Sequence, residues 1–244
     1  NLQSIKIHQA IRLFRTMSEG KSDEKVILAY WDIRGLAQAA RFALEYASIP
    51  YVNVTYACGD APEYNVDAWK IPKAENKWPL DFPNLPYLIQ NNVKITQSNA
   101  ILRHIARIGK IGSQDPDMQS LADCYLEQIM DLRNAYVREL YGGGGFDSHR
   151  KAVEANIFPI YNRILGERSW LCGDSISIAD FHLYEMVFQH NNQFSGILDN
   201  FPNLTAFLQR FENLPKIAEY LKSDRFGQWP FNNKMAKFGS TKTY

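Results

Sequence analysis

The sequence predicts two parts of different fold class, an α/β part followed by an all-α part. Strand-type runs alternate with helical runs as far as about residue 110, whereas only helical patterns remain from residue 117 onward. A chain of 244 residues is long enough to form two modest domains. We therefore expect an N-terminal α/β domain over residues 25–112 and an all-α domain over residues 113–244.

The α/β part should contain two parallel strands joined by a helix, followed by a hairpin and another helix. β-branched and aromatic runs predict the strands, and a helix between the first two strands requires them to be parallel. Pro72 and Pro79 argue against a long helix between residues 63 and 80. The expected elements, in order, are a strand over 26–30, a helix over 36–47, strands over 51–56, 86–89 and 93–96, and a helix over 98–107.

The all-α part should be a helical bundle. A four-glycine run, Gly142–Gly145, should end its first and longest helix, and Pro159 should kink or divide the second. Ser177 and Asp180 fit a capping box at the start of the third. The expected helices cover residues 117–140, 148–165, 177–189, 202–211 and 215–221.

The composition argues against several classes of function. Lys and Arg total 27 against 26 Asp and Glu, and the basic residues are scattered, so we expect no nucleic-acid or membrane partner. Cys58, Cys124 and Cys172 lie far apart, without the spacing of a metal site or a disulfide framework, and we expect the last two to be packed. Unpaired cysteines favour a reducing compartment, which predicts a cytoplasmic protein without a bound metal.

Residues 1–24 differ from the rest of the chain. Up to Ser18 the segment carries Lys6, Arg12 and Arg15 and has no acidic residue. We expect a disordered N-terminal extension. A transit peptide and a stretch that precedes a start at Met17 are the alternative interpretations.

Four long motifs carry a family resemblance. They are Tyr30-Trp-Asp-Ile-Arg-Gly-Leu-Ala-Gln38, Cys58-Gly-Asp-Ala-Pro-Glu-Tyr64, Asp81-Phe-Pro-Asn-Leu-Pro-Tyr-Leu88 and Thr96-Gln-Ser-Asn-Ala-Ile-Leu-Arg103. Together with shorter matches beyond residue 170, they make residues 25–240 similar to cytosolic glutathione transferases, and the first three motifs resemble the mu class. The resemblance implies a thioredoxin-like N-terminal domain, an all-α C-terminal domain and a homodimer. It also implies reduced glutathione as a co-substrate and no cofactor.

The reaction that this resemblance implies is attack of the glutathione thiolate on a hydrophobic electrophile, as in detoxification. A free thiol with a pKa of about 8.5 is mostly protonated at pH 7, and a hydrogen bond donated to the sulfur stabilises the thiolate. Tyr30, at the end of the first strand, matches the family's catalytic tyrosine and would donate this bond. Without the motif, Tyr30 would be one of 13 tyrosines and an ordinary half-buried strand residue.

The resemblance also assigns residues to glutathione binding. Pro86 is expected to be cis, so that the Leu85 backbone can pair with the cysteinyl part of glutathione as an added strand would. Ser98, at the start of a helix, would hold the γ-glutamyl carboxylate; its alternative role is only to cap that helix. The full expected set is Tyr30, Trp31, Trp69, Lys73, Asn84, Leu85, Pro86, Gln97, Ser98 and Asp131, the last reaching the ligand of the other subunit.

Two departures from the family pattern fall near the glycine end of glutathione. About two extra positions between residues 70 and 80 leave Lys77 competing with Lys73 for the glycine carboxylate. Val66 stands where mu-class sequences carry an arginine. The loss of this cation should weaken glutathione binding by about 1 kcal/mol.

The electrophile should meet an apolar wall formed by Ile33, Leu36 and the C-terminal segment 229–233. Tyr141 matches the family tyrosine that faces the electrophile and can donate a hydrogen bond to it as negative charge develops. The glycine run after Tyr141 departs from the family and is expected to loosen this wall.

Two other functions stay open on the sequence: a non-catalytic protein that binds glutathione or hydrophobic ligands, and a glutathione-dependent isomerase. Both would keep the same fold. Catalytic turnover would distinguish a transferase from the binding protein. Only the substrate pocket would distinguish the isomerase from a transferase. A thiol–disulfide oxidoreductase is disfavoured because the thioredoxin-like part has no paired cysteine.

Overall fold

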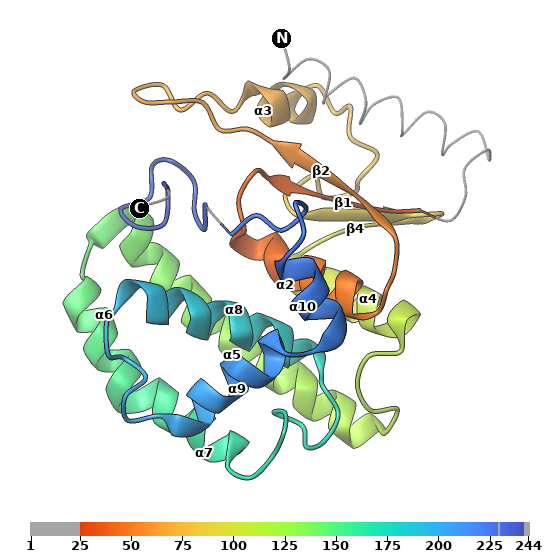
Figure 1. The fold of residues 1–244 in the computed structure, drawn as a ribbon. Coiled ribbons are helices and arrows are strands. Elements are labelled where there is room, and N and C mark those ends of the chain that lie inside the picture. Colours follow the sequence, from red (N-terminus) through yellow and green to blue (C-terminus); the bar gives the residue numbers. More distant parts are fainter. Residues whose placement is uncertain (1–24, 229, 242–244) are drawn as a thin grey trace.

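The computed structural model describes residues 25–228 and 230–241, and it confirms the predicted α/β part and helical part (Figure 1). The expected N-terminal extension, residues 1–24, and Trp229 lie outside the described residues.

A mixed four-stranded sheet forms the centre of the α/β part. Its strands are β1 (Val26–Trp31), β2 (Tyr51–Tyr56), β3 (Tyr87–Gln90) and β4 (Val93–Thr96), in the order β2-β1-β3-β4. The β1 strand runs parallel to β2 and antiparallel to β3, and β3 and β4 form the predicted hairpin. The crossover helix between β1 and β2 explains their parallel pairing, because a tight turn cannot join parallel strands.

Helices cover both faces of this sheet. The short helix η1 (Gly35–Ala37) leads into α2 (Gln38–Tyr46), which lies with α4 (Ser98–Gly109) on the side facing the helical part (Figure 1). On the opposite side lies α3 (Asp67–Ala74). This helix contains Pro72, so a helix does form in the segment where prolines argued against a long one. It spans only eight residues, and Trp69 anchors it in the core.

The helical part follows the predicted order. Its elements are α5 (Pro116–Arg138), the short π-helix η2 (Glu139–Gly143), α6 (Phe146–Ala152), the short π-helix η3 (Val153–Ile157), α7 (Phe158–Leu165), α8 (Ile178–Gln193), α9 (Pro202–Glu212) and α10 (Pro215–Leu221). Pro159 lies in the first turn of α7 and divides the predicted helix over 148–165, as expected. The capping box is also confirmed: the Ser177 amide donates to the Asp180 carboxylate at 2.8 Å.

The two parts share one hydrophobic core. The ring of Phe42 on α2 packs edge-on against Tyr184 on α8 and Phe211 on α9, with ring centroids 5.3 Å apart in both pairs. At the centre of the bundle, α5 and α8 pack side by side (Figure 1). Because this core is continuous across the two parts, the loop at the end of β1 has a fixed position against the helical part.

All three cysteines are unpaired, and one of them is not packed as predicted. Cys58 is buried and Cys172 half-buried, whereas Cys124 is exposed on α5, so the expectation of a packed Cys124 is wrong. Among the described residues, no group of three or more His, Cys, Asp or Glu side chains could hold a metal ion. In the same residues, no helix is both long and apolar enough to span a membrane.

Candidate active site

Tyr30 lies near the end of the central strand β1, where the chain leaves the sheet. Its ring packs with Ile33 and Leu36 of the loop after β1, and it is close enough to Arg133 of α5 for that charge to lower its pKa. Its side chain is only 5 % exposed. The predicted catalytic tyrosine is therefore held at the junction of the two parts.

Gly35 makes room for the Tyr30 ring. Its φ is +41°, and a Cβ at this position would lie 2.5 Å from a Tyr30 ring carbon and 2.9 Å from the hydroxyl oxygen. Only glycine satisfies both the conformation and the space. The Ile33 side chain approaches the same point, since its Cδ1 would lie 3.1 Å from that Cβ. The loop after β1 thus surrounds the hydroxyl closely.

The surroundings keep Tyr30 protonated at neutral pH. Burial raises the pKa of Tyr30; the Arg133 guanidinium, the Leu36 backbone amide and Arg41 oppose this without cancelling it. A protonated phenol is a hydrogen-bond donor. Tyr30 is thus in the state that stabilising a thiolate requires.

A buried ion pair fixes the loop that follows Tyr30. The Arg34 guanidinium forms two hydrogen bonds with the Glu185 carboxylate of α8, at 2.9 and 2.5 Å, and the two side chains are 2 % and 1 % exposed. Aromatic rings surround the cation, including Phe188 and Phe226 with centroids 4.8 and 5.1 Å away. Gln189 donates a further bond to Glu185 at 2.8 Å.

The C-terminal segment 230–239 is tied to this loop through its backbone. The amides of Arg34 and Gly35 donate to the carbonyls of Pro230 and Phe231 at 2.9 and 3.0 Å. Figure 1 shows the segment, in blue, running from α10 to the green end of α5. There the Lys237 amide donates to the Leu140 carbonyl at 2.9 Å.

Tyr141, the predicted electrophile-facing residue, meets the same segment. The Asn233 amide donates to the Tyr141 hydroxyl oxygen at 2.9 Å, which leaves the hydroxyl proton available for a bond elsewhere. Tyr141 is 38 % exposed, and burial raises its pKa despite this amide. The structure thus brings Tyr141 and Asn233 together, as the sequence predicted for this wall.

The glycine run beside this wall is held by hydrogen bonds to Glu139. The carboxylate of Glu139 accepts a hydrogen bond from the Gly145 amide at 2.7 Å, and the Glu139 carbonyl accepts one from Gly144 at 3.1 Å. A Cβ on Gly143 would lie 2.8 Å from the same carboxylate. The absence of side chains lets the run wrap tightly around Glu139.

Arg133 on α5 is a site residue that the sequence reasoning missed. It is half-buried, and its charge lowers the pKa of both Tyr30 and Tyr141. Burial in turn lowers the pKa of Arg133 itself. Its position eight residues before Tyr141, about two helical turns, is a signal that could have placed it near that wall.

The segment predicted to pair with the glutathione backbone has the expected form. The Leu85–Pro86 peptide is cis, as predicted. The Leu85 amide donates to the side-chain oxygen of Asn84 at 3.0 Å, while Asn84 itself is exposed. A peptide that pairs with Leu85 would therefore replace this contact.

Gln97 and Ser98 form the junction between β4 and α4. Gln97 precedes the helix with a φ of +71°, and Ser98 is the first helical residue, 7 % exposed. Among the described residues no side-chain hydrogen bond caps this helix, which contradicts the alternative in which Ser98 serves only as its cap. The first amides of α4 therefore have no side-chain acceptor at the position predicted for a carboxylate.

The remaining predicted residues differ in accessibility. Trp31 is half-buried, whereas Trp69 is 5 % exposed and stacks on Trp78 with centroids 5.1 Å apart. Lys77 pairs with Glu75 at 2.5 Å.

Lys73 is exposed on α3, where the structure gives it no ion-pair partner among the described residues. Leu36 is half-buried beside Tyr30, and Asp131 is exposed on α5.

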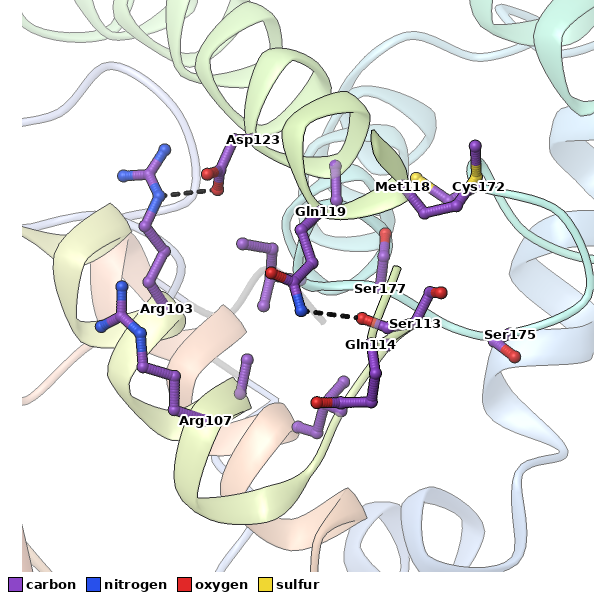
Figure 2. A pocket seen from close by; sticks show the side chains of 15 residues that line it. Arg103, Arg107, Ser113, Gln114, Met118, Gln119, Asp123, Cys172, Ser175 and Ser177 are labelled. Atoms are coloured by element: carbon purple, nitrogen blue, oxygen red, sulfur yellow. Dashed lines mark hydrogen bonds and ion pairs between the residues drawn. The ribbon is translucent and has the colours of Figure 1, made fainter. Parts of the chain in front are cut away.

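A cavity of about 150 Å³ lies elsewhere, between α4 and the first turns of α5 (Figure 2). Arg103 on its wall pairs with Asp123 at 2.7 Å and with Glu127 at 2.6 Å. None of the predicted glutathione or electrophile residues lines it. Its ion pairs join α4 to α5.

Comparisons with known proteins agree with this arrangement. Residues 27–107 match the family profile for the glutathione S-transferase N-terminal domain, and residues 130–224 match the profile for the C-terminal domain. Glutathione S-transferase Mu 5 of Mus musculus is 42% identical over 221 residues, which cover 90% of this chain and 98% of the relative. Glutathione S-transferase Mu 3 of Homo sapiens is 40% identical over 224 residues, with coverages of 89% and 97%. The chain belongs to the mu-class glutathione transferases.

Solved structures support the fold of this glutathione transferase. The glutathione S-transferase Blo t 8 superposes with a TM-score of 0.77 at 26% identity, over 87% of this chain and 99% of that one. A Pi-class glutathione S-transferase of Onchocerca volvulus superposes with a TM-score of 0.73 at 28% identity, over 87% and 100%. The predicted glutathione-conjugating activity is thereby confirmed.

Proposed function

We propose that the Tyr30 hydroxyl stabilises the thiolate of bound glutathione, which then attacks a hydrophobic electrophile beside Tyr141. The observation that carries this proposal is the placement of a protonated, buried phenol against Gly35 at the end of β1. A hydrogen bond from this phenol would favour the charged form of the sulfur. The thiolate is the nucleophile of the conjugation.

Glutathione would be held as an extended peptide along the edge of the sheet. The Leu85 backbone would pair with its cysteinyl part, with the Asn84 side chain moving aside. The first amides of α4 and the Ser98 hydroxyl would take the γ-glutamyl carboxylate, next to Gln97.

The rest of the predicted set would complete the glutathione site. Lys73 and the two tryptophans would face the glycine end. Lys77 is a weaker candidate there because it already pairs with Glu75. Val66, half-buried at the start of α3, supplies no charge to this end.

The electrophile would lie between Tyr30, Tyr141 and the side chains of Ile33 and Leu36. The Tyr141 hydroxyl has its proton free because its oxygen accepts from Asn233. That proton would stabilise negative charge as it develops on the electrophile. Arg133, close enough to affect both phenols, would add a positive field at the same place.

A homodimer would complete the site. Phe82 is 79 % exposed, in the loop that leads to Asn84, and a ring this exposed is suited to insertion into a partner subunit. Asp131, exposed on α5, would then reach the glutathione amine of the other subunit. The proposed domain boundary after residue 112 lies in the segment between the two matched family profiles.

The test is a conjugation assay with chloro-dinitrobenzene, comparing the wild type with Tyr30→Phe and with Tyr46→Phe as a control. Tyr46 is half-buried against Phe181 and its hydroxyl has no hydrogen bond within the described chain. Tyr30→Phe should lower kcat by about 100-fold at pH 7, as a rise of about two units in the pKa of the bound thiol would give. It should also abolish the ultraviolet absorbance of the bound thiolate.

Two outcomes would count against this mechanism. Glutathione affinity could fall in Tyr30→Phe while kcat and the thiolate absorbance stay unchanged. The Tyr46→Phe control could lose as much activity as Tyr30→Phe, which would indicate a general effect on the fold.

A further inference from the structure

A second cavity, of about 230 Å³, lies behind the loop that follows Tyr30. Its walls come from that loop, from α2, from β2 and from the chain just after α10. Figure 1 shows α2 and α10 lying beside each other in this region. Neither Tyr30 nor any residue assigned above to glutathione lines it.

Arg41 of α2 brings a buried positive charge to this cavity. It is 6 % exposed, its Nε donates to the Asn53 side chain at 3.1 Å, and its Nη1 donates to the Ile33 carbonyl at 2.9 Å. Its Nη2 has no hydrogen-bond partner in the part of the chain that the structure describes. No carboxylate pairs with the guanidinium there either. A buried guanidinium normally has such a partner.

Gln38, one helical turn before Arg41, contributes a second unused donor. Its side-chain oxygen accepts from Arg41 Nη1 at 3.2 Å, which fixes the orientation of the amide group. Its Nε2 therefore points elsewhere, and it is buried without a hydrogen-bond partner. Gln38 is 1 % exposed and is one of the residues that line the cavity.

The other cations of this cavity are already neutralised. Arg34 is paired with Glu185, and Arg225 is paired with Glu45. Among the described residues, Arg41 is the lining cation that forms no ion pair with a carboxylate.

Two carboxylates complete the lining. Asp32 and Asp224 are exposed, and neither side chain forms a hydrogen bond or ion pair in the described chain. The cavity thus has free donors on its buried side and free acceptors on its exposed side. An anion alone would meet repulsion from the two carboxylates, and a cation alone would meet Arg41.

We propose that this cavity binds a small zwitterion, an α-amino acid. Its carboxylate would accept hydrogen bonds from Arg41 Nη2 and Gln38 Nε2, and its ammonium group would face Asp32 and Asp224. Charge-assisted bonds of this kind are about twice as strong as neutral ones. Burial lowers the pKa of Arg41, and a bound carboxylate would oppose that effect.

Calorimetric titration of the full chain with glycine tests the proposal. One titration is made with S-methylglutathione at saturation, so that glycine cannot bind at the glutathione site. A second titration is made without S-methylglutathione. We expect saturable glycine binding in both cases. Acetate and methylammonium, which carry one charge each, should bind at least about tenfold more weakly. A failure of S-methylglutathione to bind would contradict the proposed glutathione site. The glycine titration made without it would still test the second cavity.

Three variants assign the binding to this cavity. Gln38→Leu removes the unpartnered donor and Asp224→Asn removes an exposed carboxylate, and each should weaken glycine binding about tenfold. Asp174→Asn, at an exposed aspartate outside the cavity, should leave it unchanged. Circular dichroism confirms that each variant is folded.

Several results would overturn the zwitterion site. These are no saturable binding of glycine to the wild type, equal binding of acetate and glycine, and unchanged glycine binding in both Gln38→Leu and Asp224→Asn. Tighter binding of inorganic phosphate than of glycine would also overturn it, because the site would then select an anion.

Discussion

The Asn233 amide donates a hydrogen bond to the Tyr141 hydroxyl oxygen, 2.9 Å away. The C-terminal segment and the end of α5 therefore meet at the residue that faces the proposed electrophile. Because the amide occupies a lone pair of this oxygen, the phenolic proton is the group left for substrate. This contact gives the first prediction.

Tyr141→Phe should slow conjugation of an α,β-unsaturated ketone, whose oxygen becomes negatively charged as the thiolate adds. The loss of one donor to such an oxygen should reduce kcat/KM by about 10- to 100-fold. Reaction with an alkyl iodide, which develops no charged oxygen, should change much less. Tyr125→Phe on α5 is the control. Equal losses with both substrates would contradict the donor role.

Gly35→Ala should damage both stability and activity. The added methyl group would meet the Tyr30 ring at 2.5 Å and would strain a backbone with a φ of +41°. We expect a loss of about 2–4 kcal/mol in the free energy of unfolding and a large loss of kcat. Gly142→Ala, whose Cβ would have no atom within 4 Å, should change stability by less than about 0.5 kcal/mol. Urea unfolding measures both, and equal stabilities would refute the steric argument.

Lys73→Ala should raise the KM for glutathione about fivefold, the effect of losing one partly exposed charge-assisted contact. Lys77→Ala should leave it nearly unchanged, because this ammonium group already pairs with Glu75 at the surface. Steady-state kinetics with varied glutathione measure both. A larger rise in KM for Lys77→Ala than for Lys73→Ala would indicate that Lys77, not Lys73, contacts the glycine carboxylate of glutathione.

Phe82→Ser should weaken the proposed homodimer without unfolding the subunit. The ring is 79 % exposed in the single chain, so its removal leaves no cavity in the core. Sedimentation velocity should show a shift from dimer toward monomer at micromolar concentration. Ile160→Ser, at another exposed apolar residue, is the control. A wild-type monomer, or a dimer unaffected by Phe82→Ser, would contradict the assignment.

Stability should fall as the pH drops from about 6.5 toward 3. Burial lowers the pKa of His182 to about 3, and burial likewise lowers the pKa of His190 to about 3. In this window the unfolded chain binds protons that the folded chain does not, so acid favours unfolding. Each histidine should account for about 2 kcal/mol between pH 7 and pH 5.

Urea unfolding of the wild type and of His190→Gln at pH 7 and pH 5 measures this dependence. The variant should lose less stability between the two pH values than the wild type does. His104→Gln, at a less buried histidine, should resemble the wild type more closely. Identical losses in all three proteins would contradict the assignment to buried histidines.

Features that act within one or two turns were predictable from the sequence. The break at Pro159, the capping box of Ser177 and Asp180, and the hairpin of β3 and β4 depend on neighbouring residues only. The site residues Tyr30 and Pro86 came from motifs, and their places at the end of β1 and in a cis peptide agree with the prediction.

Features that depend on distant partners were not predictable in this way. Arg34 and Glu185 are 151 residues apart, and nothing in either local pattern indicates that they pair. Cys124 was expected to be packed because its residue type is usually buried, and only the orientation of α5 shows it exposed.

The links between the loop after Tyr30 and the C-terminal segment use the carbonyls of Pro230 and Phe231. Main-chain links do not depend on which side chains the segment carries. Substitutions at its exposed positions can therefore leave the anchorage of the loop after Tyr30 unchanged. The segment that we propose to line the electrophile site can thereby vary in its side chains without releasing the loop that follows the proposed catalytic tyrosine.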